Sequence, residues 1–203
     1  MLIAVVLGAA LGVLAPDHAK ALKPLGDLFV LALLMRFLLQ WARAPARNQL
    51  SLFLAAITDF VVRPARRVIP GWWGLDIATL VLAWIAAIFE MWLVLTIKGY
   101  QLGSVPGIAF AVLSALGALQ LVRLVIYIVM GAVILQAVMI WIQTYNPMMS
   151  VVNNVTRPFL RPFQRVIPTV ANVDLSPLFV LIIGQLILTV PLAWLESMVG
   201  RLL

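Results

Sequence analysis

The stretch RPARRVIP, residues 63–70, occurs again 98 residues further on as RPFQRVIP, residues 161–168. The match extends beyond the motif without a gap and pairs Thr58 with Thr156, Asn48 with Asn146, and Asp76 with Asp174. Chance similarity between two apolar stretches would align Leu with Val, but it would not align Arg, Pro and Asp. We therefore expect two copies of one structural unit, and the remaining sequence is interpreted on that basis.

The composition indicates a membrane protein. Of the 203 residues, 65% are hydrophobic and only 10% are charged, which is far from the balance of soluble domains. Residues 77–97 contain one charged residue, Glu90, and residues 105–142 contain one, Arg123. Because about 20 mostly apolar residues suffice to cross a bilayer, both runs predict membrane spans.

Each copy has the pattern of a span, a polar loop and a second span. The expected spans are 25–41, 76–97, 122–142 and 174–194, and the expected loops are 43–75 and 144–173. The predicted fold class is an all-α integral membrane protein with two tandem repeats, at 22–98 and 121–203. Each repeat would contain two transmembrane helices joined by a cytoplasmic loop with an interfacial amphipathic helix.

Two apolar segments lie outside this pattern. Residues 1–21 resemble a signal peptide in their apolar centre but lack a basic beginning, so a retained membrane-associated segment is favoured over a cleaved signal. Residues 99–120 form either a connector or an extension of the third helix, since 105–121 is too short for a fifth span.

The distribution of arginine and lysine gives the expected orientation. Eight of the 14 basic residues lie in the two loops, whereas the opposite side is nearly neutral. The positive-inside rule therefore predicts that both loops are cytoplasmic. The net charge of +7 is explained in the same way, by membrane topology and anionic lipid headgroups and not by nucleic acid.

Both loops begin with an amphipathic helix. In the first loop the apolar face comprises Leu50, Phe53, Leu54, Ile57 and Val61, and in the second it comprises Met148, Val151, Val152, Val155 and Phe159. Such a helix is expected to lie in the membrane interface with its apolar face toward the acyl chains. The prolines of the motif, Pro64, Pro70, Pro162 and Pro168, remove backbone donors, so a rigid turn is expected there instead of a continuous helix.

The motif arginines and the following aspartates are the candidate site for lipid headgroups and a protein partner. The arginines are Arg63, Arg67, Arg161 and Arg165. Asp76 and Asp174 each directly precede an apolar run, where an aspartate is a good helix cap. An alternative is that one of them pairs with a motif arginine and fixes the loop to the start of the helix.

Three charged residues fall within the predicted spans: Arg36, Glu90 and Arg123. Charges inside a membrane are costly and suggest function. Arg36 is interpreted either as such a residue or as one that extends to lipid phosphates. For Glu90 three alternatives stay open: pairing with Arg36 or Arg123, lining a polar path, or lying near the outer interface.

No catalytic residues, cofactor site or metal site are predicted, and we expect a protein that is not an enzyme. The chain has no cysteine and one histidine, which excludes disulfides, thiolate sites and a multi-histidine site within the chain. We also find no P-loop, nucleophile elbow or metalloprotease helix motif.

The duplicated RP-x-(R/Q)-RVIP motif, followed by a short spacer and D-(I/L)-(A/S), resembles the YggT/YlmG family of small integral membrane proteins. The helix LFVLALLMRFLLQW, residues 28–41, also resembles the first helix of that family, and the likeness covers about residues 22–190. Two departures are that Gln49 replaces an expected proline and that residues 1–21 match only in being apolar.

The resemblance implies a bacterial inner-membrane protein, with a plastid membrane as the alternative. Bacterial members are associated with osmotic stress, ion homeostasis or cell-division genes, and plastid relatives with nucleoid distribution and haem attachment to cytochrome b6. We expect a non-enzymatic assembly or organising factor whose partners are anionic lipid and a membrane or division protein, with homo-oligomers also considered. The alternative is an ion transport or channel component that uses Glu90, Arg36 and Arg123.

Overall fold

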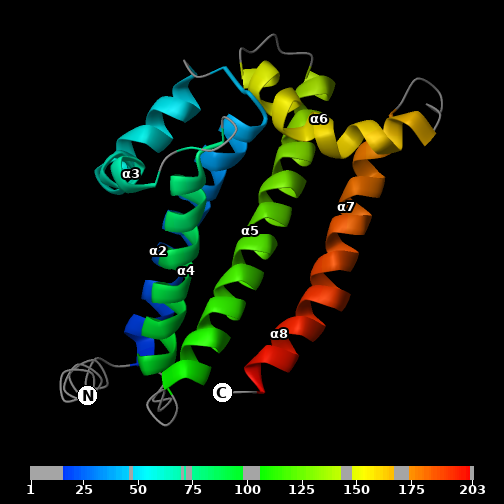
Figure 1. Cartoon of the computed structure of the whole chain (residues 1–203). Coiled ribbons are helices and arrows are strands. Elements are labelled where there is room, and N and C mark those ends of the chain that lie inside the picture. Colours follow the sequence, from blue (N-terminus) through cyan, green and yellow to red (C-terminus); the bar gives the residue numbers. More distant parts are fainter. Residues whose placement is uncertain are drawn as a thin grey trace.

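The structure is a computed structural model that describes residues 16–45, 48–69, 71, 75–97, 106–142, 148–166 and 174–201. Across these ranges the regular elements are helices, without strands (Figure 1). In chain order they are α2 (Pro16–Trp41), α3 (Gln49–Val68), α4 (Ile77–Ile97), α5 (Pro106–Ile142), α6 (Met148–Val166), α7 (Ser176–Ile187), the π-helical turn η1 (Leu188–Leu192) and α8 (Ala193–Gly200).

Within the described residues, four helical segments are long and apolar enough to cross a membrane: Lys23–Trp41, Ile77–Ile97, Gly107–Ile140 and Ser176–Gly200. They confirm the expected four-span, all-helical membrane fold. Residues 106–120 belong to α5, a helix of 37 residues, so they extend the third span. Residues 1–15 lie outside the described residues, and both interpretations of the N-terminal segment stay predictions.

The core lies where α2, α4 and α5 pack together. It is formed by Val30, Leu33 and Leu34 of α2, Ala83 and Ala87 of α4, and Leu124 and Ile128 of α5. Ala83 and Ala87 are fully buried, and small residues at such positions let the helix backbones approach closely. The apolar residues of each helix therefore lie on a face that contributes to one interface shared by the three spans.

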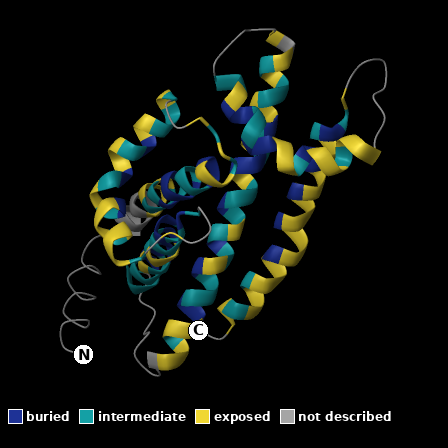
Figure 2. Cartoon of the chain, turned by 45° about the horizontal axis from the view of Figure 1, so that its top comes forward, coloured by how far each residue is buried: buried dark blue, intermediate teal, exposed yellow. Residues whose placement is uncertain are grey.

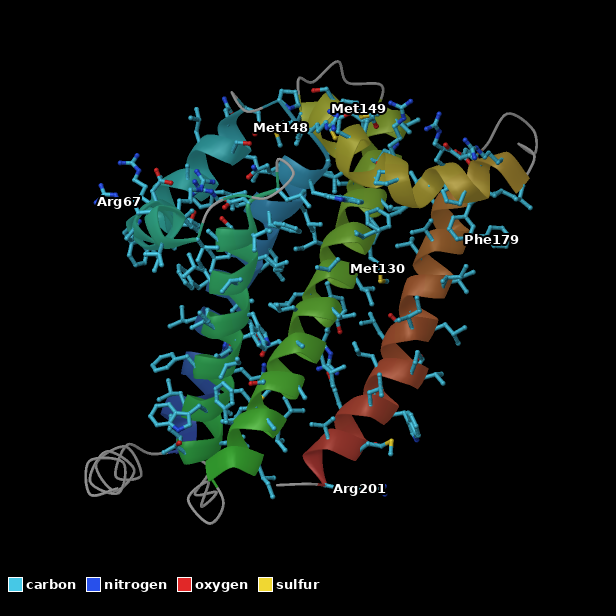
Figure 3. All side chains as sticks on the ribbon, viewed as in Figure 1. Arg67, Met130, Met148, Met149, Phe179 and Arg201 are labelled. Atoms are coloured by element: carbon cyan, nitrogen blue, oxygen red, sulfur yellow. The ribbon has the colours of Figure 1, made fainter. Side chains whose placement is uncertain are left out.

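The fourth span, α7 to α8, packs chiefly against α5. Figure 3 shows Met130 of α5 directed into the space between α5 and α7, where a side chain at Gly184 would approach the Met130 sulfur to 3.0 Å. The turn η1 contains Pro191 and interrupts the α-helical bonding of this span. Most residues on the other side of α7 and α8 are exposed (Figure 2), which suits a surface that faces acyl chains.

Helices α3 and α6 lie across the same end of the bundle, and the start of α2 and the end of α8 lie at the opposite end (Figure 1). α3 packs against α2 and α4, whereas α6 packs against α5, α7 and α2. The two polar segments of the sequence thus form one end of the molecule.

The expected break at the motif prolines is wrong for Pro64 and Pro162. α3 continues through Pro64 to Val68, and α6 continues through Pro158 and Pro162 to Val166. A proline removes one backbone donor, but its φ angle is helical, so the buried face of each helix can maintain the remaining turns. Pro70 and Pro168 lie outside the described residues.

The apolar faces of these two helices are used differently from the prediction. In α6, Val151, Val152 and Val155 are buried against neighbouring helices. In α3 the predicted face is divided, because Leu54 is buried whereas Phe53 is 60% exposed. The parts of α2 and α5 that lie nearest α6 provide the apolar surface that covers it.

Candidate functional site

Arg36 connects α2 to α3. Its Nη1 donates to Asp59 Oδ1 at 2.7 Å and to the buried Thr58 hydroxyl oxygen at 2.7 Å. Asp59 also accepts from Arg63, at 2.7 Å from Nη2. The Arg36 hydrogen bond is the main reason that the pKa of Asp59 is lowered, against the opposing effect of burial. Arg36 is therefore held by the protein at the level of α3.

Asp76 fixes the end of α3 to the start of α4. Its carboxylate accepts hydrogen bonds from Arg66 and from the Thr79 hydroxyl, and the Thr79 backbone N–H lies 3.3 Å from Oδ1. Burial alone raises the pKa of Asp76, but the hydrogen bonds from Arg66 and Thr79 outweigh it and lower the pKa. Capping and pairing thus occur together, and the partner is Arg66, a motif arginine that was not among the four candidates.

Asp174 has the corresponding role between α6 and α7. It accepts from Gln164 Nε2 at 2.8 Å and from the Ser176 backbone N–H at 2.8 Å. Burial raises its pKa, and the hydrogen bonds from Ser176 and Gln164 more than offset this and lower it. Gln164–Asp174 and Arg66–Asp76 both span ten residues of sequence. In the pair that joins α6 to α7, the Gln164 amide takes the place of the Arg66 guanidinium.

The motif arginines other than Arg66, together with Arg157, form an exposed basic surface on α3 and α6, which we call the basic end. It comprises Arg63, Arg67, Arg157, Arg161 and Arg165, all exposed. Figure 3 shows Arg67 at this end and Arg201 at the opposite end of the molecule. Pro64 and Pro162 are also exposed within the same helices. The structure thus places the described motif residues of both copies at one end.

Glu90 lies in a polar cluster near the beginning of α2. The Gln120 amide donates to Glu90 Oε2 at 3.0 Å and to Asp27 Oδ1 at 2.8 Å, and Lys23 Nζ lies 3.0 Å from Asp27 Oδ2. A side chain at Gly26 would come within 2.6 Å of the Glu90 Cγ atom. The glycine therefore provides the space that the Glu90 side chain occupies.

Pairing of Glu90 with Arg36 or Arg123 is wrong. Arg36 binds Asp59, and Arg123 of α5 binds Glu196 of α8. The nearest cation to Glu90 is Lys23, 3.7 Å away, at the end of the bundle remote from α3 and α6. Which side of the membrane this end faces stays a prediction, and so does the outer-interface alternative. Sequence reasoning missed Asp59, Gln120 and Lys23 as partners because each is brought close by helix packing, which no sequence spacing indicates.

These features define a class: a multi-pass helical membrane protein whose two amphipathic helices are attached by charged side chains to one end of its spans. Among the described residues, no group of three or more His, Cys, Asp and Glu side chains could hold a metal ion. The chain belongs to the CCB3/YggT family, which it matches over residues 18–97 and 108–195.

Relatives of this chain include several bacterial proteins. It is 34% identical to the uncharacterized protein PA0392 of Pseudomonas aeruginosa over 181 residues, which cover 88% of this chain and 90% of the relative. It is 27% identical to the uncharacterized protein YggT of Escherichia coli K12 over 158 residues, 77% of this chain and 79% of the relative. No solved structure matches. The YggT resemblance of the sequence is thereby confirmed.

Proposed function

We propose that this chain is a non-enzymatic assembly or organising factor of the bacterial inner membrane, and that its basic end binds a membrane-protein partner and anionic headgroups. The observation that carries the proposal is the arrangement of α3 and α6, which lie across one end of the spans and expose arginines there. Exposed arginine surfaces beside membrane spans suit recognition of carboxylates and phosphates.

The proposal includes a tandem duplication. Thr58 and Thr156 are both fully buried, and each hydroxyl donates to the carbonyl oxygen four residues earlier. The polar contacts of Asp76 and Asp174 also correspond. Two copies of one unit would present two similar surfaces to a partner, one on α3 and one on α6.

The attachment of both helices supports a binding role. Buried side chains on α3 and α6 pack against the spans, and the contacts of Asp59, Asp76 and Asp174 fix their positions. A preformed surface loses less conformational entropy on binding than a mobile loop would. Both helices are proposed to face the cytoplasm, since positive residues favour that side.

Copurification from cells tests the partner. The full chain, expressed with a purification tag, is expected to retain a defined set of membrane or division proteins after mild crosslinking. Replacing Arg67 and Arg165 together by Gln should reduce recovery of that set by about tenfold, the scale of one lost charge-assisted contact. A control is Arg201→Gln, which removes one positive charge at the opposite end.

Two outcomes would contradict the proposal. The first is equal recovery from the wild type and the Arg67/Arg165 variant. The second is an equal loss of the partners from the Arg201 variant, because net charge alone would then explain the effect. Cells under osmotic stress and dividing cells should be sampled separately, since the family resemblance points to both processes.

Ion transport is the second candidate, and the Glu90 cluster favours it. Glu90 is only 7% exposed within α4 and is bridged to Asp27 by Gln120. However, Arg36 and Arg123 bind other carboxylates and do not continue a path from Glu90. Proton or potassium flux through liposomes that contain the wild type, and its loss in Glu90→Gln, would place transport ahead of assembly.

A further inference from the structure

A basic cavity of about 350 Å³ lies where the end of α2 meets α6. The guanidinium-bearing residues Arg43, Arg157 and Arg161 line it together with Asn154 and the ring of Trp41. No carboxylate is among its lining residues. Three positive side chains around one small cavity form a suitable site for a phosphate group, since arginine binds phosphate through paired hydrogen bonds.

The backbone of Arg43 adds an independent argument. Its φ angle is 51°, in the left-handed region, and its N–H donates to the Gln40 carbonyl at 3.0 Å, while the Ala44 N–H donates to Leu39 at 2.9 Å. This is the Schellman arrangement that ends many helices, and glycine is the usual residue at this position. Arginine has a steric cost there that glycine lacks, and the residue that bears this cost is one that lines the cavity.

An apolar groove of about 300 Å³ lies beside the basic cavity. Hydrophobic residues of α2, α5 and α6 line it, with Gly131 of α5 among them. The linings of the two cavities lie within one turn of each other on α2, where Leu38 and Leu39 line the groove and Trp41 and Ala42 line the basic cavity. An acyl chain in the groove could therefore continue to a headgroup at the arginines.

We propose that these two cavities together bind one anionic phospholipid, with its phosphate at Arg43, Arg157 and Arg161 and an acyl chain in the groove. The inference rests on the proposed membrane-surface location of α6, but it does not require a protein partner. Trp41, the last residue of its span, is 41% exposed, as expected at the level of lipid headgroups. Charge complementarity and the adjoining groove favour a phospholipid over a soluble phosphate.

Native mass spectrometry of the full chain in neutral detergent tests the site. The protein is mixed with equal amounts of phosphatidylglycerol and phosphatidylcholine of the same acyl composition, and retained lipid is counted. The wild type should retain phosphatidylglycerol preferentially. Arg157→Gln with Arg161→Gln should reduce that preference by about tenfold, whereas the control Lys23→Gln with Arg201→Gln, which removes the same charge away from the basic end, should not.

Two further variants separate binding from folding. Arg43→Gly should lose the preference for phosphatidylglycerol while its unfolding midpoint stays equal to or above that of the wild type. Gly131→Leu should extend into the groove and reduce retention of the two-chain lipid, since a Cβ atom there meets no atom within 4 Å and Gly131 lines the groove. Gly107→Leu, equally unobstructed on α5 but outside the groove, is its control.

The proposal is overturned if the Arg157/Arg161 variant and its control retain phosphatidylglycerol equally. It is also overturned if inorganic phosphate displaces the phospholipid at equal concentration, since the site would then bind soluble phosphate. Unchanged lipid retention by Gly131→Leu would remove the groove from the site and overturn the two-cavity arrangement. Because the partner test changes Arg67 and Arg165, failure of the lipid site would not affect its result.

Discussion

At the scale of single residues, the contact between Arg36 and Asp59 shows how a charge in a span is accommodated. The side chains are 15% and 23% exposed, and Thr58 supplies a further acceptor for the guanidinium. A charge removed from water is tolerated when its hydrogen bonds are satisfied, and loss of one partner is then costly. The two residues should therefore contribute to stability only as a pair.

We predict that Asp59→Ala lowers the free energy of unfolding by about 2 kcal/mol, because it leaves Arg36 without its carboxylate. Added to Arg36→Met, the same change should cost about 1 kcal/mol or less. Equilibrium unfolding of the four variants in mixed micelles gives the coupling energy. The matched control is Arg63→Gln, whose exposed pair with Asp59 should contribute under about 1 kcal/mol. Additive effects of Arg36 and Asp59 would contradict the pairing.

At the scale of elements, carboxylates at the starts of α4 and α7 hold the two amphipathic helices. The pKa values of Asp59, Asp76 and Asp174 are all lowered from their ordinary value of 3.8. The folded state therefore binds protons less readily than the unfolded chain does, and stability is linked to pH.

The direction of that linkage gives a prediction. Above the ordinary value all three carboxylates are charged in both states, and their stabilisation is fully present. As the pH falls below about 4, the unfolded chain takes up protons first, and the stabilisation is lost as the folded pKa values are passed. Thermal unfolding followed by circular dichroism should show midpoints that fall below this pH. The double variant Asp59→Asn, Asp76→Asn should have a weaker pH dependence, and an unchanged slope would contradict the assignment.

The crossing of α2 and α4 gives a second prediction at this scale. Gly26→Ala should lower the free energy of unfolding by about 1–3 kcal/mol, since the new methyl group would overlap the Glu90 side chain. In a Glu90→Ala background the same change should be nearly neutral. Gly131→Ala, which meets no atom within 4 Å, is the control and should stabilise by up to about 1 kcal/mol. Equal destabilisation in both backgrounds would argue against overlap with Glu90.

The sequence was informative about these elements but not about their contacts. Periodicity predicted both amphipathic helices, and the aspartates before apolar runs predicted caps, with a partner arginine as the alternative. The prolines wrongly indicated a break in each helix. Each proline removes only one backbone hydrogen bond, and the buried side chains of α3 and α6 stabilise the remaining turns. Arg66 was not distinguished from Arg67, since the choice depends on which side of α3 faces Asp76.

At the scale of the whole molecule, the four spans follow from composition and run length, whereas neighbours among the spans do not. Glu90, Arg36 and Arg123 were considered as partners because all three lie in apolar runs. Packing instead gives each of them a polar neighbour on another helix. Such pairings depend on the rotation of each helix about its axis and on its depth in the membrane, which a single sequence does not specify.

The orientation of the molecule can be tested because the chain has no cysteine. Single cysteines at Arg67, Arg165 and Arg201 should divide into two groups on labelling of intact cells with an impermeant maleimide. Arg67→Cys and Arg165→Cys should react only after the cells are opened, whereas Arg201→Cys should react from outside. Reaction of all three from one side would contradict the four-span topology.

The π-helical turn η1 has a consequence for the direction in which Glu196 points. A π turn contains about one residue more than an α turn, so residues beyond it are rotated by about 100° relative to a straight α-helix. α8 follows η1 directly, and its Glu196 contacts Arg123 of α5. A chain one residue shorter in this turn would form an uninterrupted span, and Glu196 would face away from α5. The one additional residue in this turn thus sets the direction of the Glu196 carboxylate and provides the half-buried Arg123 with an ion pair.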